Sequence, residues 1–385
     1  MPSPRPKEVK TAAYIVEQLR AMPGYDIQNG VGKTGVKAVI KGGKAGPVIA
    51  LRADIDALPV VERNELPFKS TAKAMWQGSE TGVMHACGHD AHVAMLLGAA
   101  SIFSKMRAEL PGTIVLLFQP AEEGGGAGRA SGAFEMVADG AMDNPKVQAV
   151  FGQHISAAYP GGRIGYRYGG AMASGDTFNI VIKGVGSHGA VPWMSKDPIV
   201  TAAQIVTNLQ SIVSRQADMT AGGAVVTVGQ ISGGNRVNII PESATLSGTI
   251  RTLNETTRNR MHEAVTLMAQ KTAEASGLTA EVKTERAYPV LSNDAELGAK
   301  VLAALEAAAG AGNVRESPPS MASEDFGAFA AKAPGFFWNL RASPRPDMGG
   351  APNHSPLFEI DEQYMQVGVK ALVNVSLAYL RGGGK

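Results

Sequence analysis

The segment His85-Ala86-Cys87-Gly88-His89-Asp90-Ala91-His92 holds the only cysteine of this 385-residue chain, with a histidine two positions to either side. A thiolate and an imidazole at that spacing can bind one divalent metal ion. For the cysteine taken alone, a buried small thiol is the more common interpretation. Asp90 can also cap a helix that runs from Ala91 to about Met106. The segment therefore predicts a metal site at the start of a helix.

The composition is that of an ordinary globular protein, with 44% hydrophobic and 18% charged residues. The length predicts two domains. A net charge of +2 without a basic block gives no support to nucleic-acid binding. No run of about eighteen apolar residues predicts a membrane span, and residues 1–10 lack the apolar core of a signal peptide. One cysteine cannot form an internal disulfide, which favours a cytoplasmic protein.

Apolar runs alternate with helical segments in the first half of the chain. Runs of this kind predict buried parallel strands joined by helical crossovers. We therefore expect an α/β fold, with a mixed, mostly parallel sheet and helices on both faces. Side chains beyond the carboxyl ends of such strands gather in one cleft. The strands are expected at residues 46–51, 113–118 and 148–151, and the residues that follow them are Asp54, Glu122, Glu123 and His154.

The pattern changes near Gly169. Strand and helix signals then follow in the order β-α-β-β-α-β, which is a split βαβ module. The α/β character resumes at Asp294, so we expect the module to be an insertion. The predicted domains are residues 1–172 with 288–385, and an inserted domain at residues 173–287.

Glu122 and Glu123 are neighbours at a predicted strand end. Adjacent carboxylates are usually solvated surface residues. Here side-chain alternation directs them to different sides. One can then bind a metal ion while the other takes a proton from an attacking water.

Several histidines have more than one interpretation. His85 and His92 cannot both join His89 as ligands, so we interpret them as supporting residues, with ligation by His92 as the weaker alternative. His154, after an apolar strand, is favoured as a ligand. His354 lies in a loop rich in turn formers and is open between a ligand and a surface residue.

Two residues of the predicted inserted domain are candidates for substrate contact. His188 sits among glycines that allow close approach of a ligand. Arg251 ends a strand and can pair with a carboxylate. Each could equally be a solvated residue.

Two competing motifs fail. The loop Gly124–Gly132 resembles a dinucleotide-binding loop, but the frame that starts at Gly126 places Ser131 where glycine is required. Around Ser187, the residue two positions earlier is Val185, so the serine-hydrolase elbow is not formed. A nucleotide-dependent enzyme is therefore disfavoured.

In this order, the clusters resemble the acetylornithine deacetylase and carboxypeptidase G family of dinuclear metallopeptidases. The resemblance is to the amidohydrolase branch, which includes hippurate hydrolase, N-acyl amino acid amidohydrolases and auxin-conjugate hydrolases. It covers nearly the whole chain. The segments that carry it are residues 84–90 (MHACGHD), 118–123 (FQPAEE), 186–190 (GSHGA), 323–326 (SEDF) and 353–355 (NHS).

The resemblance implies two divalent metal ions per subunit. Zinc or manganese is favoured, and cobalt or nickel also occur in similar proteins. Cys87 would bridge the two ions, and Glu122 would be the general base and later the proton donor. Asp54 would orient a ligand histidine from behind. By the same resemblance His89 and His154 would complete the coordination of one ion, and Glu123 and His354 that of the other. His188 would reach the active site of a partner subunit and polarise the scissile carbonyl of the substrate there. Asn238 and Arg251 would hold the substrate.

Two departures from the wider family qualify the resemblance. Arg52 stands where the family has a histidine, and Cys87 stands where it has a bridging aspartate. The amidohydrolase branch shares both changes. The branch also begins with a longer helix that carries a His-x-x-Pro-Glu segment. The sequence therefore leaves open whether the chain is a truncated or processed form that has lost an export signal.

From these residues we expect a metal-dependent amidohydrolase that cleaves N-acyl amino acids or related small conjugates, with a water activated between the two ions. The alternatives are a dipeptidase or aminopeptidase of the same family, and a catalytically silent dimeric binding protein. The expected partners are a small N-acyl amino acid or dipeptide-like substrate and a second copy of the chain, with no nucleic acid and no membrane. The acyl pocket is not identified, and Trp193, Phe336 and Trp338 are open between core and pocket.

Overall fold

The computed structural model describes residues 8–124, 131–345 and 348–383. The chain forms two compact units. The first comprises residues 1–169, 292–318 and 325–385, and the second comprises residues 170–291 with 319–324. Six residues near the C-terminal third thus join the second unit, although they lie outside the segment that the sequence assigned to it.

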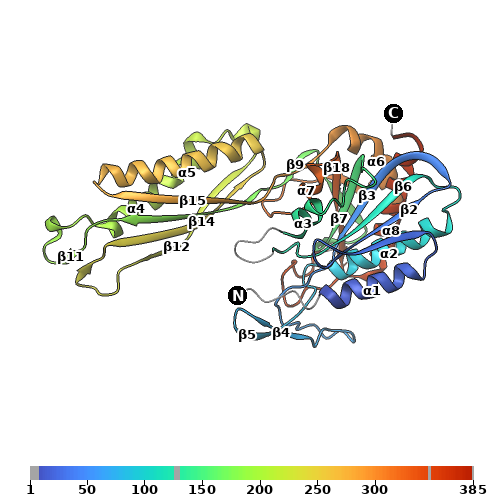
Figure 1. The fold of residues 1–385 in the computed structure, drawn as a ribbon, viewed down its shortest axis with the longest axis horizontal. Coiled ribbons are helices and arrows are strands. Elements are labelled where there is room, and N and C mark those ends of the chain that lie inside the picture. Colours follow the sequence, from blue (N-terminus) through green and yellow to red (C-terminus); the bar gives the residue numbers. More distant parts are fainter. Residues whose placement is uncertain (1–7, 125–130, 346–347, 384–385) are drawn as a thin grey trace. The chain divides into compact units, whose positions relative to one another are not determined.

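In the described part of the chain, the first unit is built on an eight-stranded sheet (Figure 1). Its four central strands, β6, β3, β7 and β18, run parallel, and the strands beyond them include antiparallel pairs. The predicted mixed, mostly parallel sheet is confirmed. In spatial order the strands are β1 (Tyr25–Val31), β2 (Gly35–Lys41), β6 (Pro111–Gln119), β3 (Lys44–Asp54), β7 (Ala149–Pro160), β18 (Gly335–Ser343), β8 (Arg163–Tyr166) and β17 (Val314–Glu316).

Helices cover both faces of this sheet because its central strands are apolar on both sides. Ile49 and Leu51 of β3 point into the main core, whereas Ala50 between them is buried on the opposite face. Phe336 and Trp338 belong to the main core, so neither lines a pocket. The main core is covered by α1 (Glu8–Arg20), α2 (His89–Lys105), α6 (Ala295–Ala309) and α8 (Met365–Ala378), and the other face by α3 (Gly132–Ala138) and α7 (Gly327–Ala330).

Helix α2 begins two residues earlier than the sequence indicated. Its cap is Gly88, with a φ of 84°, and the predicted cap at Asp90 is wrong because Asp90 lies inside the first turn. A Cβ at position 88 would lie 2.3 Å from Ile155 Cγ2. Glycine is therefore needed both for the left-handed backbone and for the close approach of the strand that carries Ile155. The early start places His89 in the first turn of the helix.

The second unit is a four-stranded antiparallel sheet with two long helices. One core is formed where the helices pack on the sheet, as alternating residues of β12 such as Val226 (buried) and Val225 (exposed) show. The predicted β-α-β-β-α-β order is observed (Figure 1). The elements in chain order are β10 (Gly175–Lys183), α4 (Pro198–Gln216), β12 (Ala224–Gly233), β14 (Ser243–Thr252), α5 (Glu255–Ala275) and β15 (Thr279–Tyr288).

The remaining elements are short. None of the helices in the described residues combines the length and apolar character needed to cross a bilayer. Trp193 is 78% exposed on a short helical turn of the second unit. The short strands are β4 (Lys73–Trp76), β5 (Ser79–Gly82), β9 (Gly169–Met172), β11 (Ser187–His188), β13 (Ile239–Ile240) and β16 (Leu291–Asn293), and the helical turns are Pro192–Met194, Met219–Ala221, Glu362–Tyr364 and Tyr379–Gly383.

A buried ion cluster ties α5 to the sheet of the second unit. The carboxylate of Asp176 on β10 accepts two hydrogen bonds from Arg258, at 2.6 and 2.7 Å, and one from His262 at 2.8 Å. Burial alone would raise the pKa of Asp176, but the hydrogen bonds from Arg258 and His262 hold it below its ordinary value. The ionised carboxylate therefore stabilises the second unit.

We expect the second unit to lose stability in acid. The contribution of Asp176 is fully present above the ordinary aspartate pKa of about 3.9 and is lost as the pH falls through the lower pKa of the folded state. Asp176→Asn should remove this pH dependence and cost about 3 kcal/mol at neutral pH, because the buried Arg258 loses a charged partner. Calorimetric melting of the intact protein between about pH 2 and pH 7 measures both effects.

Glu281→Gln is the matched control, since Glu281 pairs with Lys183 on the surface. It should leave the acid profile unchanged. A profile for Asp176→Asn that coincides with that of the unmodified protein would contradict the assignment.

Candidate metal centre

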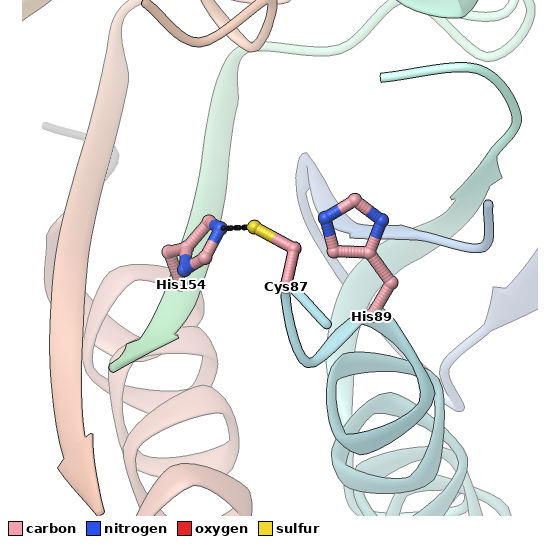
Figure 2. Close-up of side chains that lie close together, drawn as sticks. All are labelled: Cys87, His89 and His154. Carbon is pink, nitrogen blue, oxygen red and sulfur yellow. Dashed lines mark hydrogen bonds between the residues drawn. The ribbon is translucent and has the colours of Figure 1, made fainter. Parts of the chain in front are cut away.

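Cys87, His89 and His154 meet at the carboxyl edge of the large sheet (Figure 2). Cys87 and His89 flank the glycine that caps α2, and His154 lies on β7. Cys87 Sγ is 3.3 Å from His154 Nε2, and the thiol is buried. His154 Nδ1 lies 2.8 Å from the carbonyl oxygen of Ile155, so Nδ1 carries the proton and Nε2 faces the sulfur.

A second group of ligand-type atoms shares the same thiol. Cys87, Glu123 and His354 place one ligand atom each within 4.8 Å of one another. His354 Nε2 is 2.9 Å from Glu123 Oε1. The loop that carries His354 is held by its own amide, which donates to the carbonyl of Ala86 at 2.7 Å. The structure thus brings His354 into the site, which the residue pattern alone left open.

Asn353 also belongs to the site, although the sequence assigned it no role. Its side-chain amide donates to the carbonyls of Cys87 and Ile155, both at 3.1 Å. It therefore joins the loop of His354 to the α2 start and to β7. The signal that could have found it is its place beside His354 in the Asn-His-Ser motif.

His89 is oriented by Asp56, which the sequence did not single out. His89 Nδ1 lies 3.0 Å from both the carboxylate and the carbonyl oxygen of Asp56. The other carboxylate oxygen of Asp56 accepts the amide of Glu123 at 3.1 Å. His89 Nε2 is buried and has no hydrogen-bond partner among the described residues. A buried ring nitrogen that faces a thiol and carboxylates without a partner fits a metal ligand.

Asp54 makes its shortest histidine contact with His92. Its carboxylate pairs with His92 Nδ1 at 2.5 Å and with the guanidinium of Arg52 at 2.7 Å, while His89 Nε2 is 3.7 Å away. His92 Nε2 in turn accepts the amide of Ile155 at 2.7 Å. Both nitrogens of His92 are therefore engaged, which agrees with its interpretation as a supporting residue. His85 is in none of the ligand groups formed by the described residues.

The electrostatics of the site favour a thiolate among imidazolium rings. Burial opposes ionisation of Cys87, but the charge of His154, its hydrogen bond to the sulfur and the nearby rings of His354 and His89 lower the pKa of the thiol to about 2. Hydrogen bonds to Cys87 and Glu123 raise the pKa of His354 to about 10. Burial raises the pKa of Glu123. A bound cation would replace the ring protons and balance the same negative charges.

The carboxylate of Glu122 lies beside the candidate ligands. It is 6% exposed and forms a further group with His89 and Glu123, in which the ligand-type atoms are within 4.8 Å. The loop starts from Pro120 and Ala121 at the end of β6. A buried carboxylate beside two candidate metal positions is placed to exchange protons with a reacting molecule.

Three predicted residues lie in the second unit. His188 is exposed on β11, and its Nδ1 accepts the amide of Ala190 at 3.0 Å. Asn238 accepts the amide of Gly189 through its carbonyl at 2.8 Å. Arg251 donates to the hydroxyl of Ser323. Their roles at the metal centre stay predictions. Residues 125–130, which belong to the loop compared above with a dinucleotide-binding motif, lie outside the described residues.

Comparison with known proteins identifies the family. The sequence pattern described as peptidase family M20/M25/M40 matches residues 50–378. The chain belongs to this family. The M20 relatives include thermostable carboxypeptidase 2 of Saccharolobus solfataricus, 40% identical over 95% of this chain and 89% of that protein. They also include the N-acetylcysteine deacetylase of Bacillus subtilis, 40% identical over 90% of this chain and 86% of that protein.

A solved M20 structure has the same fold. It is a dinuclear metal-binding peptidase from Bacillus subtilis, 35% identical, with a TM-score of 0.81 over 99% of this chain and 94% of that chain. The family predicted from the sequence is confirmed, and with it a metal-dependent hydrolase that acts on amide bonds. The donor set of thiol, imidazole and carboxylate accommodates two divalent ions, because the thiol of Cys87 is common to two groups.

We expect Cys87→Ala to lower the content of both metal ions, because each ligand group loses the same sulfur. Elemental analysis of the purified variant measures the metal bound per chain. His188→Ala is the control, since its side chain lies in the second unit and should leave the metal content unchanged. Full metal content in Cys87→Ala would show that the thiol is not shared.

Proposed function

We propose that this protein hydrolyses the amide bond between an acyl group and an amino acid. The observation that carries the proposal is the thiol of Cys87, common to two ligand groups, with the buried carboxylate of Glu122 beside them. The N-acetylcysteine deacetylase among the relatives supports an N-acyl amino acid as substrate. Both halves of the proposal, the chemistry and the substrate class, can be tested separately.

In this proposal the thiolate of Cys87 would help to hold both metal ions. His89 and His154 would hold one of them, and Glu123 and His354 would hold the other. Thiolate and imidazole ligands favour zinc, and manganese is the second choice. When bound, the ions supply Lewis acidity that polarises a carbonyl and acidifies water. Asp56 keeps the ring of His89 in the orientation that points Nε2 at the ions.

Glu122 moves the protons of the reaction. As general base it accepts a proton from the attacking water at its carboxylate oxygen. As general acid it later donates that proton to the nitrogen of the leaving amino acid, so that one carboxyl group serves both halves of the hydrolysis. Its burial keeps bulk water from competing for the proton.

The second unit would complete the site. We propose that His188 stabilises the charge that develops on the scissile carbonyl oxygen, supplied by one subunit of a homodimer to the other. Asn238 and Arg251 would hold the carboxylate of the amino acid, for which a guanidinium has matching geometry.

A second candidate is cleavage of a peptide bond in a small peptide. The relative named carboxypeptidase, 40% identical, favours it. The same ligands and the same base would serve, and the difference would lie in whether an acyl group or an amino acid precedes the bond.

The deciding assay measures amine release from acetyl-, benzoyl- and indole-acetyl-amino acids and from unblocked dipeptides. We expect cleavage of the acylated substrates, loss of activity after chelation, and its return with zinc or manganese, because the ions supply the Lewis acid. Activity on dipeptides alone would select the second candidate. Activity that survives removal of all metal would refute a metal-dependent mechanism.

Glu122→Gln should lower kcat by about 10²–10⁴-fold with both metal ions retained, because the amide cannot accept the proton. Kinetics and elemental analysis on the same preparation separate these effects. Glu80→Gln, at an exposed pair with Lys73, is the matched control and should be fully active. A fully active Glu122→Gln would remove Glu122 from the reaction.

A further inference from the structure

The residue immediately before Glu122 has an unusual backbone. Ala121 has a φ of 47°, in the left-handed region that residues with a Cβ rarely adopt, and it is only 3% exposed. Such a conformation persists where the surroundings hold it in place, and it is concentrated at functional sites. The direction in which Glu122 leaves the end of β6 depends on this one residue.

The carbonyl side of Ala121 is held by the loop itself. Its oxygen accepts the amide of Gly132 at 3.1 Å. A Cβ at position 132 would lie 1.6 Å from the carbonyl oxygen of Pro120, so only glycine allows the two ends of the loop to approach so closely. This contact joins the two ends of the loop. It uses the carbonyl of Ala121, so the amide of Ala121 needs a hydrogen-bond acceptor from another part of the chain.

The amide side of Ala121 is held by a residue 113 positions away. Ala121 N donates to Glu8 Oε1 at 3.1 Å, and both residues are buried. The other carboxylate oxygen of Glu8 accepts the hydroxyl of Thr34, in the turn between β1 and β2. The Glu8 carboxylate thus joins the start of α1, a hairpin turn and the loop of the proposed general base.

Helix α1 is a rigid support for this contact. Ile15 and Leu19 are fully buried in the main core, and the helix packs on β1, β2 and α2. Glu8 is the first residue of the helix, so its carboxylate is delivered from an anchored element. A buried acid in this position is not explained by metal binding, because Glu8 belongs to none of the ligand groups among the described residues.

We propose that Glu8 is a positioning residue for the hydrolytic reaction. By accepting the Ala121 amide it holds the left-handed turn that directs Glu122 toward the metal centre. It acts through the main chain and touches neither substrate nor metal. The inference rests on the proposed function for its effect on catalysis, whereas the contact with the Ala121 amide can be tested without any substrate.

Two substitutions separate the length of the side chain from its charge. Glu8→Gln keeps the full length and an oxygen that can accept the Ala121 amide, but removes the carboxylate. Glu8→Asp keeps the carboxylate but shortens the side chain by one carbon, about 1.5 Å, so that the hydrogen bond cannot form. Thr34→Val is the matched control, because it removes the hydrogen bond from the Thr34 hydroxyl to Glu8 and leaves the one from Ala121 intact.

We expect Glu8→Gln and Thr34→Val to keep kcat within about threefold. Glu8→Asp should lower kcat by about 100-fold, the scale of a 1 Å misplacement of a reacting group, with KM and metal content unchanged. Loss of activity in Glu8→Gln but not in Glu8→Asp would mean that charge rather than length matters, and would overturn the proposal. So would full activity in Glu8→Asp.

Hydrogen exchange at the Ala121 amide gives a readout that needs no activity. In a peptide spanning residues 118–123, exchange should accelerate in Glu8→Asp and stay slow in Glu8→Gln and Thr34→Val. Unchanged exchange in a folded Glu8→Asp would overturn the proposal even if the protein proved to have a different substrate. If the unmodified protein cleaves no amide, the proposed function fails, while the exchange experiment still decides the contact of Glu8.

Discussion

The carboxyl edge of the large sheet is built around one buried guanidinium. The side chain of Arg52, at the end of β3, is inaccessible to solvent and pairs with Asp54 at 2.7 Å and with Asp325 at 3.0 Å. Its Nε donates to Gln119 at the end of β6, at 2.7 Å. A buried charge costs several kcal/mol unless it is paired and hydrogen-bonded. All these partners must therefore be in place together, which fixes the ends of two central strands relative to each other.

A chain of hydrogen bonds connects Arg52 to the metal centre. Asp54, ionised beside Arg52, binds His92, and His92 accepts the amide of Ile155 next to His154. Burial opposes ionisation of Asp54, but the positive charges of His89 and Arg52 and the hydrogen bond from His92 hold its pKa well below the ordinary value. On the other side, Asp325 accepts the amide of Ala133, which starts the helix after the loop of Glu122. One guanidinium thus supports the strand of one ligand and the far end of the base-bearing loop.

The proposed ligands come from elements that are far apart in the chain. Cys87 and His89 precede and begin α2, His154 lies on β7, and Glu123 and His354 lie on separate loops. Short contacts such as those of Asp56, with His89 and with the amide of Glu123, join them. The site is therefore prearranged by hydrogen bonds to the main chain, and bound ions need only displace protons from rings that already converge.

Much of this could be predicted from the sequence. The apolar runs predicted buried parallel strands, and the rule that functional groups gather beyond their carboxyl ends brought Glu122, Glu123 and His154 to one edge before any coordinates. The resemblance carried by residues such as Cys87 and His354 predicted the family, and the strand and helix signals after Gly169 predicted the order of the second unit. These features depend on local periodicity and on motifs, which a linear sequence contains.

What only the tertiary structure decided was which group bonds which. Asp54 and Asp56 are two residues apart at a strand end, and His89 and His92 are three apart on a helix, so each pair shares a face. Spacing alone cannot tell which carboxylate meets which ring, and the structure pairs Asp54 with His92 and Asp56 with His89. Asn353 and Glu8 reach the site across 266 and 113 residues of chain, for which no sequence period exists. The sequence by itself determined the chemical groups and the layers that carry them, and the packing of the layers decided their partners, because hydrogen bonds between distant segments are set by three-dimensional distance.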